Sequence, residues 1–267
     1  MYFHIIKMKR ILKSELDKFY TKESLSKKLI NYTDLSKYDY VIDPCCGDGS
    51  FFNNIEHPNK IGIDILPQCP NVITQDFLTW DSSSLKGNII TISNPPFGKQ
   101  GSLALKFINK AAEYSNTIAF ILPLSFAKSS MKNKIPLNFH LEYEEILEPN
   151  SFLLDGDDYD VKCVYQIWVK KGFNRVLSRK EQEVGWYYTK DKNIADLSVR
   201  RVGVYAGKTM IDCDKSEQSH YFIVLEDKTK IGLVLEKLND NKWVDLTVGP
   251  RSISKEELNP IINKIIN

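Results

Sequence analysis

The sequence contains no pair of cysteines with the spacing of a metal or redox site. Its five cysteines are scattered along 267 residues, none forms a C-x-x-C pair, and no Cys/His cluster has zinc spacing. Because the count is odd and the chain is not small, structural disulfides are not expected, which favours a reducing compartment. We expect an intracellular, cytoplasmic protein without a metal site, and a nuclear location stays open.

Long apolar runs are also absent. Near the N-terminus, Lys7, Lys9 and Arg10 interrupt the apolar residues, so this segment lacks the core of a signal peptide. No run elsewhere is long enough to cross a membrane. The sequence therefore predicts no membrane partner, and it leaves open whether translation starts at Met1 or Met8.

The sequence also lacks a large excess of positive or negative charge. A formal net charge of +2, with 26% charged residues, does not announce a nucleic-acid partner, although a local basic patch stays compatible with one. The hydrophobic content of 42% supports a substantial core, and 267 residues suit one large domain or two ordinary ones.

Short apolar runs that end in polar residues recur along the N-terminal part of the chain. The expected buried strands are residues 40–43, 60–64, 71–74, 88–92 and 117–122. Helical spacing occurs at 102–114, and the segment from Ser14 to Tyr32 is mostly helical but interrupted at 19–21. The resulting alternation predicts a parallel sheet covered on both faces. Two more expected strands, 139–146 and 161–170, enclose the loop DGDDYD and predict an antiparallel hairpin at the edge of the sheet.

A basic and weakly apolar segment around 171–180 marks a boundary. We expect two domains, 1–172 and 173–267, of which the second is a smaller α+β domain. Its expected strands and helices are 185–189, 197–205, 221–225, 229–238 and 254–266. The last helix should begin with a capping box, because Ser254 is followed three residues later by Glu257.

The first expected strand leads into a glycine loop, DPCCGDGSFF at 43–52. Gly47 and Gly49 allow a tight turn and a close approach of the backbone to a ligand, and a helix is expected to start near Ser50. A dinucleotide fingerprint needs a third glycine where Phe52 stands. Asp43, the acid before the loop, would repel phosphates and attract an ammonium group.

Two later strands also end in acids. Asp64 stands where an acid binds ribose hydroxyls in nucleotide-binding sheets. Asp76 could accept a hydrogen bond from the amine of adenine, and Phe77 could cover its ring. The carboxyl ends of parallel strands meet at one edge, so these groups describe a pocket for a nucleoside with a charged amino-acid tail, such as S-adenosylmethionine. Each acid alone could equally be a helix N-cap.

The segment NPPFG at 94–98 follows the strand at 88–92. Two adjacent prolines cannot donate backbone hydrogen bonds and fix the direction of the carbonyl between them. The Asn94 side-chain oxygen and the Pro95 carbonyl could accept both hydrogens of one planar amine, and Phe97 could stack on a base flipped out of a duplex. Taken alone the segment is ordinary turn chemistry, and the upstream motifs favour a site.

These motifs, in this order, resemble the S-adenosylmethionine-dependent N6-adenine methyltransferases with an Asn-Pro-Pro-Phe/Tyr motif. The resemblance covers roughly the first 170 residues, and Lys22 stands where the family has proline. It implies a Rossmann-like α/β methyltransferase sheet, mostly parallel, followed by a target-recognition domain. It also implies the catalytic residues Asn94, Pro95, Pro96 and Phe97 and the cofactor-binding residues Phe19, Tyr20, Thr21, Asp43, Pro44, Cys45, Gly47, Gly49, Asp64, Ile65, Asp76 and Phe77.

The acceptor is expected to be nucleic acid, with DNA favoured over RNA and a cap-adjacent adenosine still possible. The candidate substrate-binding residues are basic or polar and lie in expected loops: Lys99, Gln100, Arg200, Arg201, Lys208 and Arg251. Two alternatives stay open. One is the same chemistry on guanine N2 of RNA or glutamine N5 of protein, and the other is a non-catalytic module of this fold that binds nucleic acid. The oligomeric state is left undecided.

Overall fold

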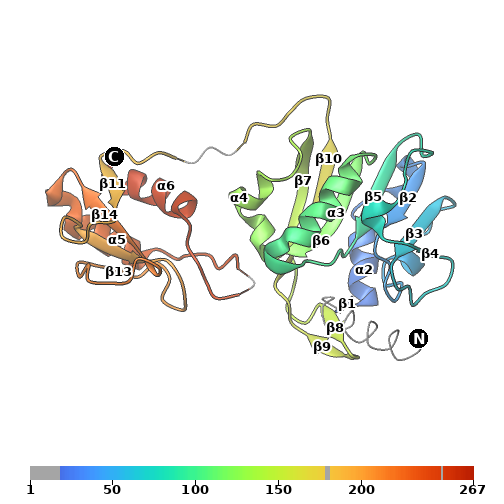
Figure 1. Ribbon diagram of the computed structural model, residues 1–267, viewed down its shortest axis with the longest axis horizontal. Coiled ribbons are helices and arrows are strands. Elements are labelled where there is room, and N and C mark those ends of the chain that lie inside the picture. Colours follow the sequence, from blue (N-terminus) through green and yellow to red (C-terminus); the bar gives the residue numbers. More distant parts are fainter. Residues whose placement is uncertain (1–18, 178–180, 248) are drawn as a thin grey trace. The chain divides into compact units, whose positions relative to one another are not determined.

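The computed structural model describes residues 19–177, 181–247 and 249–267 (Figure 1). The chain divides into two compact units, Met1–Leu177 and Ser178–Asn267, called here the N-terminal and C-terminal units.

A seven-stranded sheet forms the centre of the N-terminal unit, in the order β4-β3-β2-β5-β6-β10-β7 (Figure 1). Neighbouring strands from β4 to β6 are parallel, and β10 runs antiparallel to both β6 and β7. This confirms the predicted Rossmann-like, mostly parallel sheet with an antiparallel hairpin at its edge. The strands are β2 (Tyr40–Asp43), β3 (Lys60–Asp64), β4 (Ile73–Thr74), β5 (Ile89–Ser93), β6 (Thr117–Pro123), β7 (Phe139–Ile146) and β10 (Cys163–Lys170).

Both faces of this sheet are covered, which explains why its central strands are apolar throughout. Leu29 and Ile30 of α2 (Glu23–Ile30) pack with alternate sheet residues such as Val41, Ile90 and Ile121. The helix α3 (Ser102–Ala112) buries its own apolar stripe and contacts β6. Shorter helical elements are η1 (Leu35–Lys37), η2 (Phe52–Asn54), η3 (Phe77–Thr79), η4 (Lys99–Gly101), η5 (Leu124–Ala127) and α4 (Ser129–Lys132).

A second, three-stranded sheet joins segments that are far apart in sequence. The strand β1 (Tyr20–Thr21) pairs with β8 (Phe152–Leu154), which forms a hairpin with β9 (Asp157–Tyr159). The expected loop DGDDYD is therefore the turn and second strand of a hairpin. The mostly helical segment expected over 14–32, with its interruption at 19–21, is confirmed by α2 and by the extended residues 20–21, while residues 14–18 lie outside the described residues.

The helix expected to start near Ser50 is also wrong. Only the short 3₁₀ turn η2 forms there. The Asp48 carboxylate accepts hydrogen bonds from the backbone and the hydroxyl of Ser50, and asparagine occupies positions 53 and 54. Such local side-chain bonds compete with helical ones, and asparagine favours turns over helix interiors.

The C-terminal unit is a four-stranded antiparallel sheet, β11-β14-β12-β13, packed with two helices, as the predicted α+β class requires. Its elements are β11 (Trp186–Thr189), β12 (Leu197–Arg200), β13 (Thr209–Met210), β14 (His220–Leu225), η6 (Lys228–Lys230), α5 (Ile231–Asp240) and α6 (Lys255–Ile266). The capping box of Ser254 and Glu257 is confirmed.

The strand predicted over 197–205 ends early, at Arg200. Gly203 and Gly207 adopt φ values of +89° and +99°, which turn the chain back. The Arg200 amide then donates to the Lys208 carbonyl at 2.8 Å, so a loop replaces the expected strand end.

Within the described residues, no helix is long and apolar enough to span a membrane, and no group of three metal-ligating side chains occurs.

Candidate functional site

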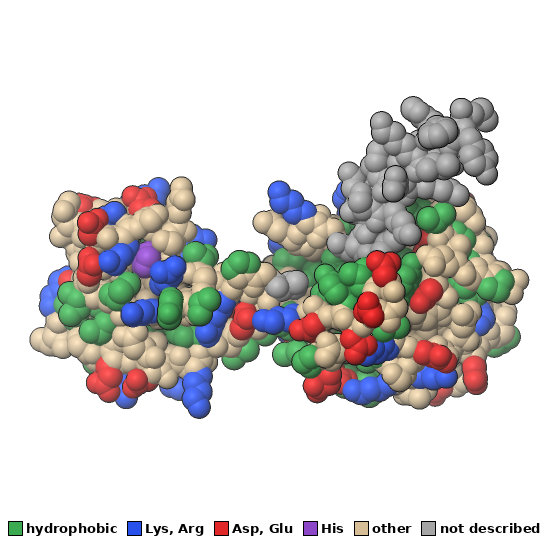
Figure 2. Space-filling view, turned by 90° about the horizontal axis from the view of Figure 1, so that it is seen from below, with side chains coloured by type: hydrophobic (Ala, Val, Ile, Leu, Met, Phe, Trp, Pro, Cys, Tyr) green, Lys and Arg blue, Asp and Glu red, His purple; other side chains and the backbone are tan. Residues whose placement is uncertain are grey.

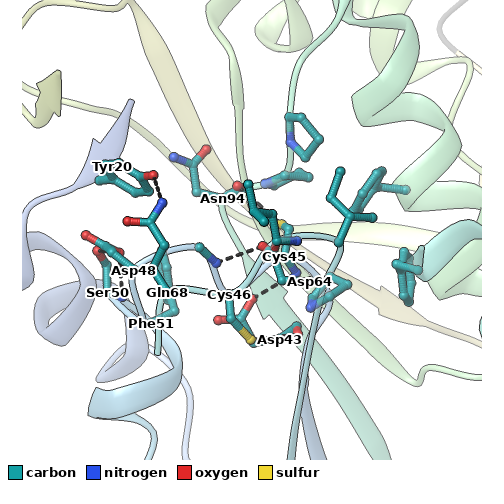
Figure 3. A pocket seen from close by; sticks show the side chains of 18 of the residues that line it. Tyr20, Asp43, Cys45, Cys46, Asp48, Ser50, Phe51, Asp64, Gln68 and Asn94 are labelled. Atoms are coloured by element: carbon teal, nitrogen blue, oxygen red, sulfur yellow. Dashed lines mark hydrogen bonds between the residues drawn. The ribbon is translucent and has the colours of Figure 1, made fainter. Parts of the chain in front are cut away.

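One cavity lies at the carboxyl edge of the large sheet, where the predicted polar residues meet (Figure 3). Asp43 ends β2 and Asp64 ends β3, while Asp76 and Asn94 come shortly after β4 and β5. All four line this cavity. The parallel register of the strands is what brings residues up to 51 positions apart in the sequence to one edge.

The glycine loop after β2 has the backbone that its sequence predicts. Gly47 and Gly49 adopt φ values of +53° and +94°, which disfavour any side chain. A Cβ at Gly49 would lie 2.3 Å from Asn53 Nδ2, and one at Gly47 would lie 3.2 Å from the Tyr20 ring. Gly47 lines the cavity, whereas Gly49 shapes the turn without reaching the cavity wall.

Asp43 is buried, with 1% of its surface exposed. Its Oδ1 accepts hydrogen bonds from Ser93 Oγ at 2.6 Å and, more weakly, from the Cys45 amide at 3.3 Å. Burial raises the pKa of this carboxyl to about 7, against the opposing effect of these donors, and the nearby charge of Asp64 raises it further. A cation bound beside Asp43 would therefore favour its ionised form.

Burial disfavours a nucleophilic role for the neighbouring thiols. The Cys45 sulfur lies 3.0 Å from Ser93 Oγ and donates to the Asn94 carbonyl at 3.4 Å. Burial raises the pKa of Cys45 and of Cys46 well above the usual thiol range, and the Asp43 charge adds to this. Because the thiolate is the reactive form, these thiols serve as walls and weak donors.

Asp64 and Asp76 already bind backbone amides of their own segments. Asp64 accepts from the amides of Gly47 at 2.8 Å and Leu66 at 2.7 Å, which ties the glycine loop to β3. Asp76 caps η3 by accepting from the Leu78 amide at 2.9 Å. A carboxylate can accept about four hydrogen bonds, so both retain capacity for a ligand. The structural and binding interpretations of these acids are thus compatible.

The predicted apolar walls are present on either side of these acids. Phe77 is buried and its ring centroid lies 5.2 Å from that of Phe107, while Ile65 is 46% exposed. All three line the cavity, as does Pro44. The cavity therefore combines apolar lining side chains with the carboxylates of Asp43, Asp64 and Asp76.

Asn94 holds the most informative polar atom of the cavity. Its Nδ2 donates to Thr21 Oγ1 at 3.1 Å. Its Oδ1 is buried and has no hydrogen-bond partner among the described residues. A buried acceptor without a donor costs about 1–3 kcal/mol, so a donor from water or from a ligand is expected at this atom. Pro95 and Pro96, next in the chain, also line the cavity.

Phe97 does not take the place predicted for it. Its ring is 6% exposed, lies in the core, and meets Phe19 edge-on with centroids 5.3 Å apart. Its carbonyl accepts from the amides of Leu103 and Ala104 and so joins the start of α3. The predicted stacking of Phe97 on a base is wrong for this conformation, because burying an apolar ring in the core is favourable.

The predicted segment Phe19-Tyr20-Thr21 forms one wall of the cavity. The Tyr20 hydroxyl accepts from Gln68 Nε2 (Figure 3), and burial raises the pKa of Tyr20. Phe19 packs on Phe152, with ring centroids 5.1 Å apart. This wall is held by the β8–β9 hairpin, a feature that the sequence did not reveal.

Sequence reasoning missed several lining residues. They are Cys46, Asp48, Ser50, Phe51, Leu66, Gln68, Gln75, Leu78, Leu103 and Phe107. Leu103 and Phe107 could have been found, because they lie four residues apart on the helix that follows NPPFG. Gln68 carries no sequence signal, since only the fold brings it to Tyr20.

The predicted substrate-binding residues are not on the cavity wall. Lys99 and Gln100 are exposed in η4, directly after the NPPFG segment. The others belong to the C-terminal unit, where Arg201 lies over the Tyr221 ring at 5.0 Å and Lys208 over the Tyr205 ring at 6.0 Å. Arg200 Nε donates to the Val202 carbonyl, and Arg251 Nη2 donates to the Trp243 carbonyl.

No family model matches the chain. A stretch of 130 residues is 30% identical to the Arabidopsis thaliana Protein ENHANCED DOWNY MILDEW 2, covering 44% of this chain and 10% of that protein. The chain therefore spans about a tenth of the length of that curated relative.

Among solved structures, a putative RNA methyltransferase from Pyrococcus horikoshii aligns with a TM-score of 0.45 and 17% identity, over 58% of this chain and 87% of its own. The methyltransferase subunit of a type I restriction-modification system from Streptococcus thermophilus aligns with a TM-score of 0.44 and 15% identity, over 93% of this chain and 58% of its own. At these scores the likenesses carry no argument about function, which therefore depends on the residues of the cavity.

Proposed function

We propose that the chain is an S-adenosylmethionine-dependent methyltransferase that acts on the exocyclic N6 amine of adenine in nucleic acid. The observation that carries the proposal is the buried, unpartnered Oδ1 of Asn94 at the edge of a cavity that the glycine loop and three acids also line. An amine is one of the donors that can satisfy such an acceptor.

The cavity residues fit the proposed cofactor. Asp43 is a buried carboxyl that a positive ammonium group would ionise, and Gly47 leaves the loop free of side chains beside it. Asp64 has remaining acceptor capacity for ribose hydroxyls. Phe77 and Ile65 supply apolar surface for adenine, with Asp76 at the rim for its amine.

The bound cofactor would supply an electrophilic methyl group. The protein's own contribution would be to hold the acceptor amine by two oxygens, Asn94 Oδ1 and the Pro95 carbonyl. Binding both hydrogens draws the nitrogen lone pair out of conjugation with the ring and aims it at the donor. In-line placement at about 3–3.5 Å can supply a large share of the rate enhancement. No thiolate or metal is assigned a role.

The C-terminal unit supports nucleic acid as the acceptor. Several of its lysines form salt bridges with nearby carboxylates, as in the pairs Lys192–Asp214, Lys215–Asp212 and Lys228–Asp196. By contrast, Arg200, Arg201 and Lys208 have no carboxylate partner among the described residues. Figure 2 shows Lys and Arg side chains gathered with a histidine on one face of this unit.

An exposed aromatic side chain accompanies these cations. Tyr205 is 65% exposed, and Lys208 lies over its ring. Unpaired cations bind phosphates, and an exposed ring offers a surface on which a base can stack. We therefore assign Arg200, Arg201, Lys208 and Arg251 to substrate binding within this proposal, and the domain 173–267 to target recognition.

The test is transfer of labelled methyl from S-adenosylmethionine to duplex DNA, single-stranded DNA, RNA and protein in parallel, with Asn94→Ala as the matched control. We expect label in nucleic acid, and on the order of 100-fold less or lower with the variant. Label only in protein would replace the proposal with glutamine methylation. No label in any acceptor, despite measurable cofactor binding, would replace it with the non-catalytic module.

A further inference from the structure

We infer that Thr21 is a positioning residue that fixes the orientation of the Asn94 amide and so directs Oδ1 toward the acceptor amine. This inference rests on the proposed function. It assigns Thr21 a role different from the cofactor contact that the sequence resemblance implies.

The geometry of the pair carries the inference. Thr21 is 3% exposed, and its Oγ1 accepts a hydrogen bond from Asn94 Nδ2 at 3.1 Å. An amide is planar, so anchoring the nitrogen on one side places the oxygen on the other. That oxygen is the atom that has no hydrogen-bond partner among residues 19–177, 181–247 and 249–267. Without the threonine oxygen, rotation about the last side-chain bond of Asn94 could exchange its donor and acceptor positions.

The chain holds Thr21 from outside the parallel sheet. Thr21 pairs with Phe152 in β8, and the next amide, of Lys22, donates to the Ser151 carbonyl at 3.2 Å. The Lys22 ammonium also lies 2.6 Å from an Asp158 carboxylate oxygen in β9. In the sequence, the β8–β9 hairpin lies between β7 and β10, the two strands at the edge of the large sheet. It therefore connects this edge to Thr21 and, through Thr21, to Asn94.

Asn94 is fixed independently. It directly follows β5, and its carbonyl accepts from the Cys45 thiol. Pro95 and Pro96 after it restrict the backbone. Because the backbone is held at both Thr21 and Asn94, rotation of the Asn94 side-chain amide is the main motion that remains. The hydrogen bond to the Thr21 hydroxyl restricts this rotation.

A threonine hydroxyl can accept one hydrogen bond and donate another, so Thr21 could also touch the cofactor. The two roles predict different kinetics. Loss of a cofactor contact weakens binding of S-adenosylmethionine. Loss of amide orientation lowers kcat and leaves that binding unchanged, because Asn94 would hold the acceptor and not the cofactor.

The test compares Thr21→Val, Thr21→Ser and the wild type. Valine keeps the shape and removes the oxygen, whereas serine keeps the oxygen. From the value of one hydrogen bond, we expect Thr21→Val to lower kcat about three- to tenfold. The dissociation constant of S-adenosylmethionine should stay within about twofold of the wild type, and serine should restore kcat.

Thr91→Val is the control for loss of a buried hydroxyl. Thr91 is fully buried in β5 and its Oγ1 lies 2.6 Å from Ser115 Oγ, away from the cavity lining. We expect this variant to lose stability without a change in kcat. A Thr21→Val variant with normal kcat, or with cofactor binding weakened as much as kcat, would overturn the inference.

A second measurement does not depend on activity. The side-chain amide resonances of Asn94 can be assigned by their loss in Asn94→Ala. In the ligand-free protein, Thr21→Val should shift them and speed their exchange with water several-fold, and Thr21→Ser should not. Unchanged resonances in Thr21→Val would overturn the inference. If the wild type methylates no acceptor, the proposed function fails and these resonances alone decide the role of Thr21.

Discussion

Replacing Asp43 by asparagine should stabilise the ligand-free protein, and the gain should grow with pH. The Asp43 carboxyl is buried, and its pKa lies at about 7 in the folded chain against a usual value of 3.8. Between these two values the folded state keeps a proton that the unfolded state has lost. Stability of the wild type therefore falls as pH rises through this window.

The size of the effect follows from the shift. Each unit of pKa corresponds to about 1.4 kcal/mol, so a shift from 3.8 to about 7 costs the wild type about 4 kcal/mol once Asp43 is ionised. Asparagine cannot ionise, and its side-chain oxygen can still accept from Ser93 and the Cys45 amide. We expect equal stabilities near pH 4 and a difference approaching this value at pH 8.

Urea unfolding at one-unit pH intervals measures this difference. The control is Asp39→Asn, which removes an exposed carboxylate just before the opposite end of the same strand. That variant removes one carboxylate charge without removing a buried carboxyl. A difference between Asp43→Asn and the wild type that stays constant from pH 4 to pH 8 would refute the assignment of a protonated, buried carboxyl.

Three further changes have defined outcomes. Asn94→Ala should lower methyl transfer on the order of 100-fold or more, with S-adenosylmethionine binding in calorimetry nearly unchanged; a loss of that binding would mean that Asn94 holds the cofactor. Gly49→Ala should destabilise the chain by about 1–3 kcal/mol in urea unfolding, since its φ is +94° and its Cβ would meet Asn53, whereas Gly172→Ala meets open space and should be neutral. Lys208→Ala should weaken nucleic-acid binding and reduce the slope of log K against log salt concentration by about 1. Lys237→Ala, outside the group of Arg200, Arg201 and Lys208, should change neither.

The sequence predicted the large sheet because its strands are short apolar runs that end in polar residues. Asp43, Asp64, Asp76 and Asn94 were placed together by one rule, that parallel strands present their carboxyl ends at one edge. The observed cavity contains all four. Such a rule works because hydrogen-bonded register, and not side-chain detail, determines which residues meet.

The sequence could not show which of two competing environments or hydrogen-bond patterns a side chain adopts. Phe97 has two apolar environments within reach, a base in the cavity and the core beside Phe19, and only the packed fold decides between them. The helix expected at Ser50 gave way to local bonds to Asp48. Both outcomes depend on contacts that form only after the chain has folded.

Long-range pairings of short segments were also beyond the sequence. The strand β1 has two residues and pairs with β8, about 130 positions away. No periodicity can appear in two residues, so the sequence showed only an interruption of the helical pattern at 19–21 and not a strand. The partner of the Asn94 amide was hidden for the same reason.

The most direct test of adenine methylation by this protein is to identify the methylated nucleoside. Nucleic acid incubated with the protein and isotopically labelled S-adenosylmethionine would be digested and its nucleosides separated by mass spectrometry. We predict label in N6-methyladenine, and on the order of 100-fold less of it or lower with Asn94→Ala. Label in N2-methylguanine or on cytosine, with none in N6-methyladenine, would contradict it.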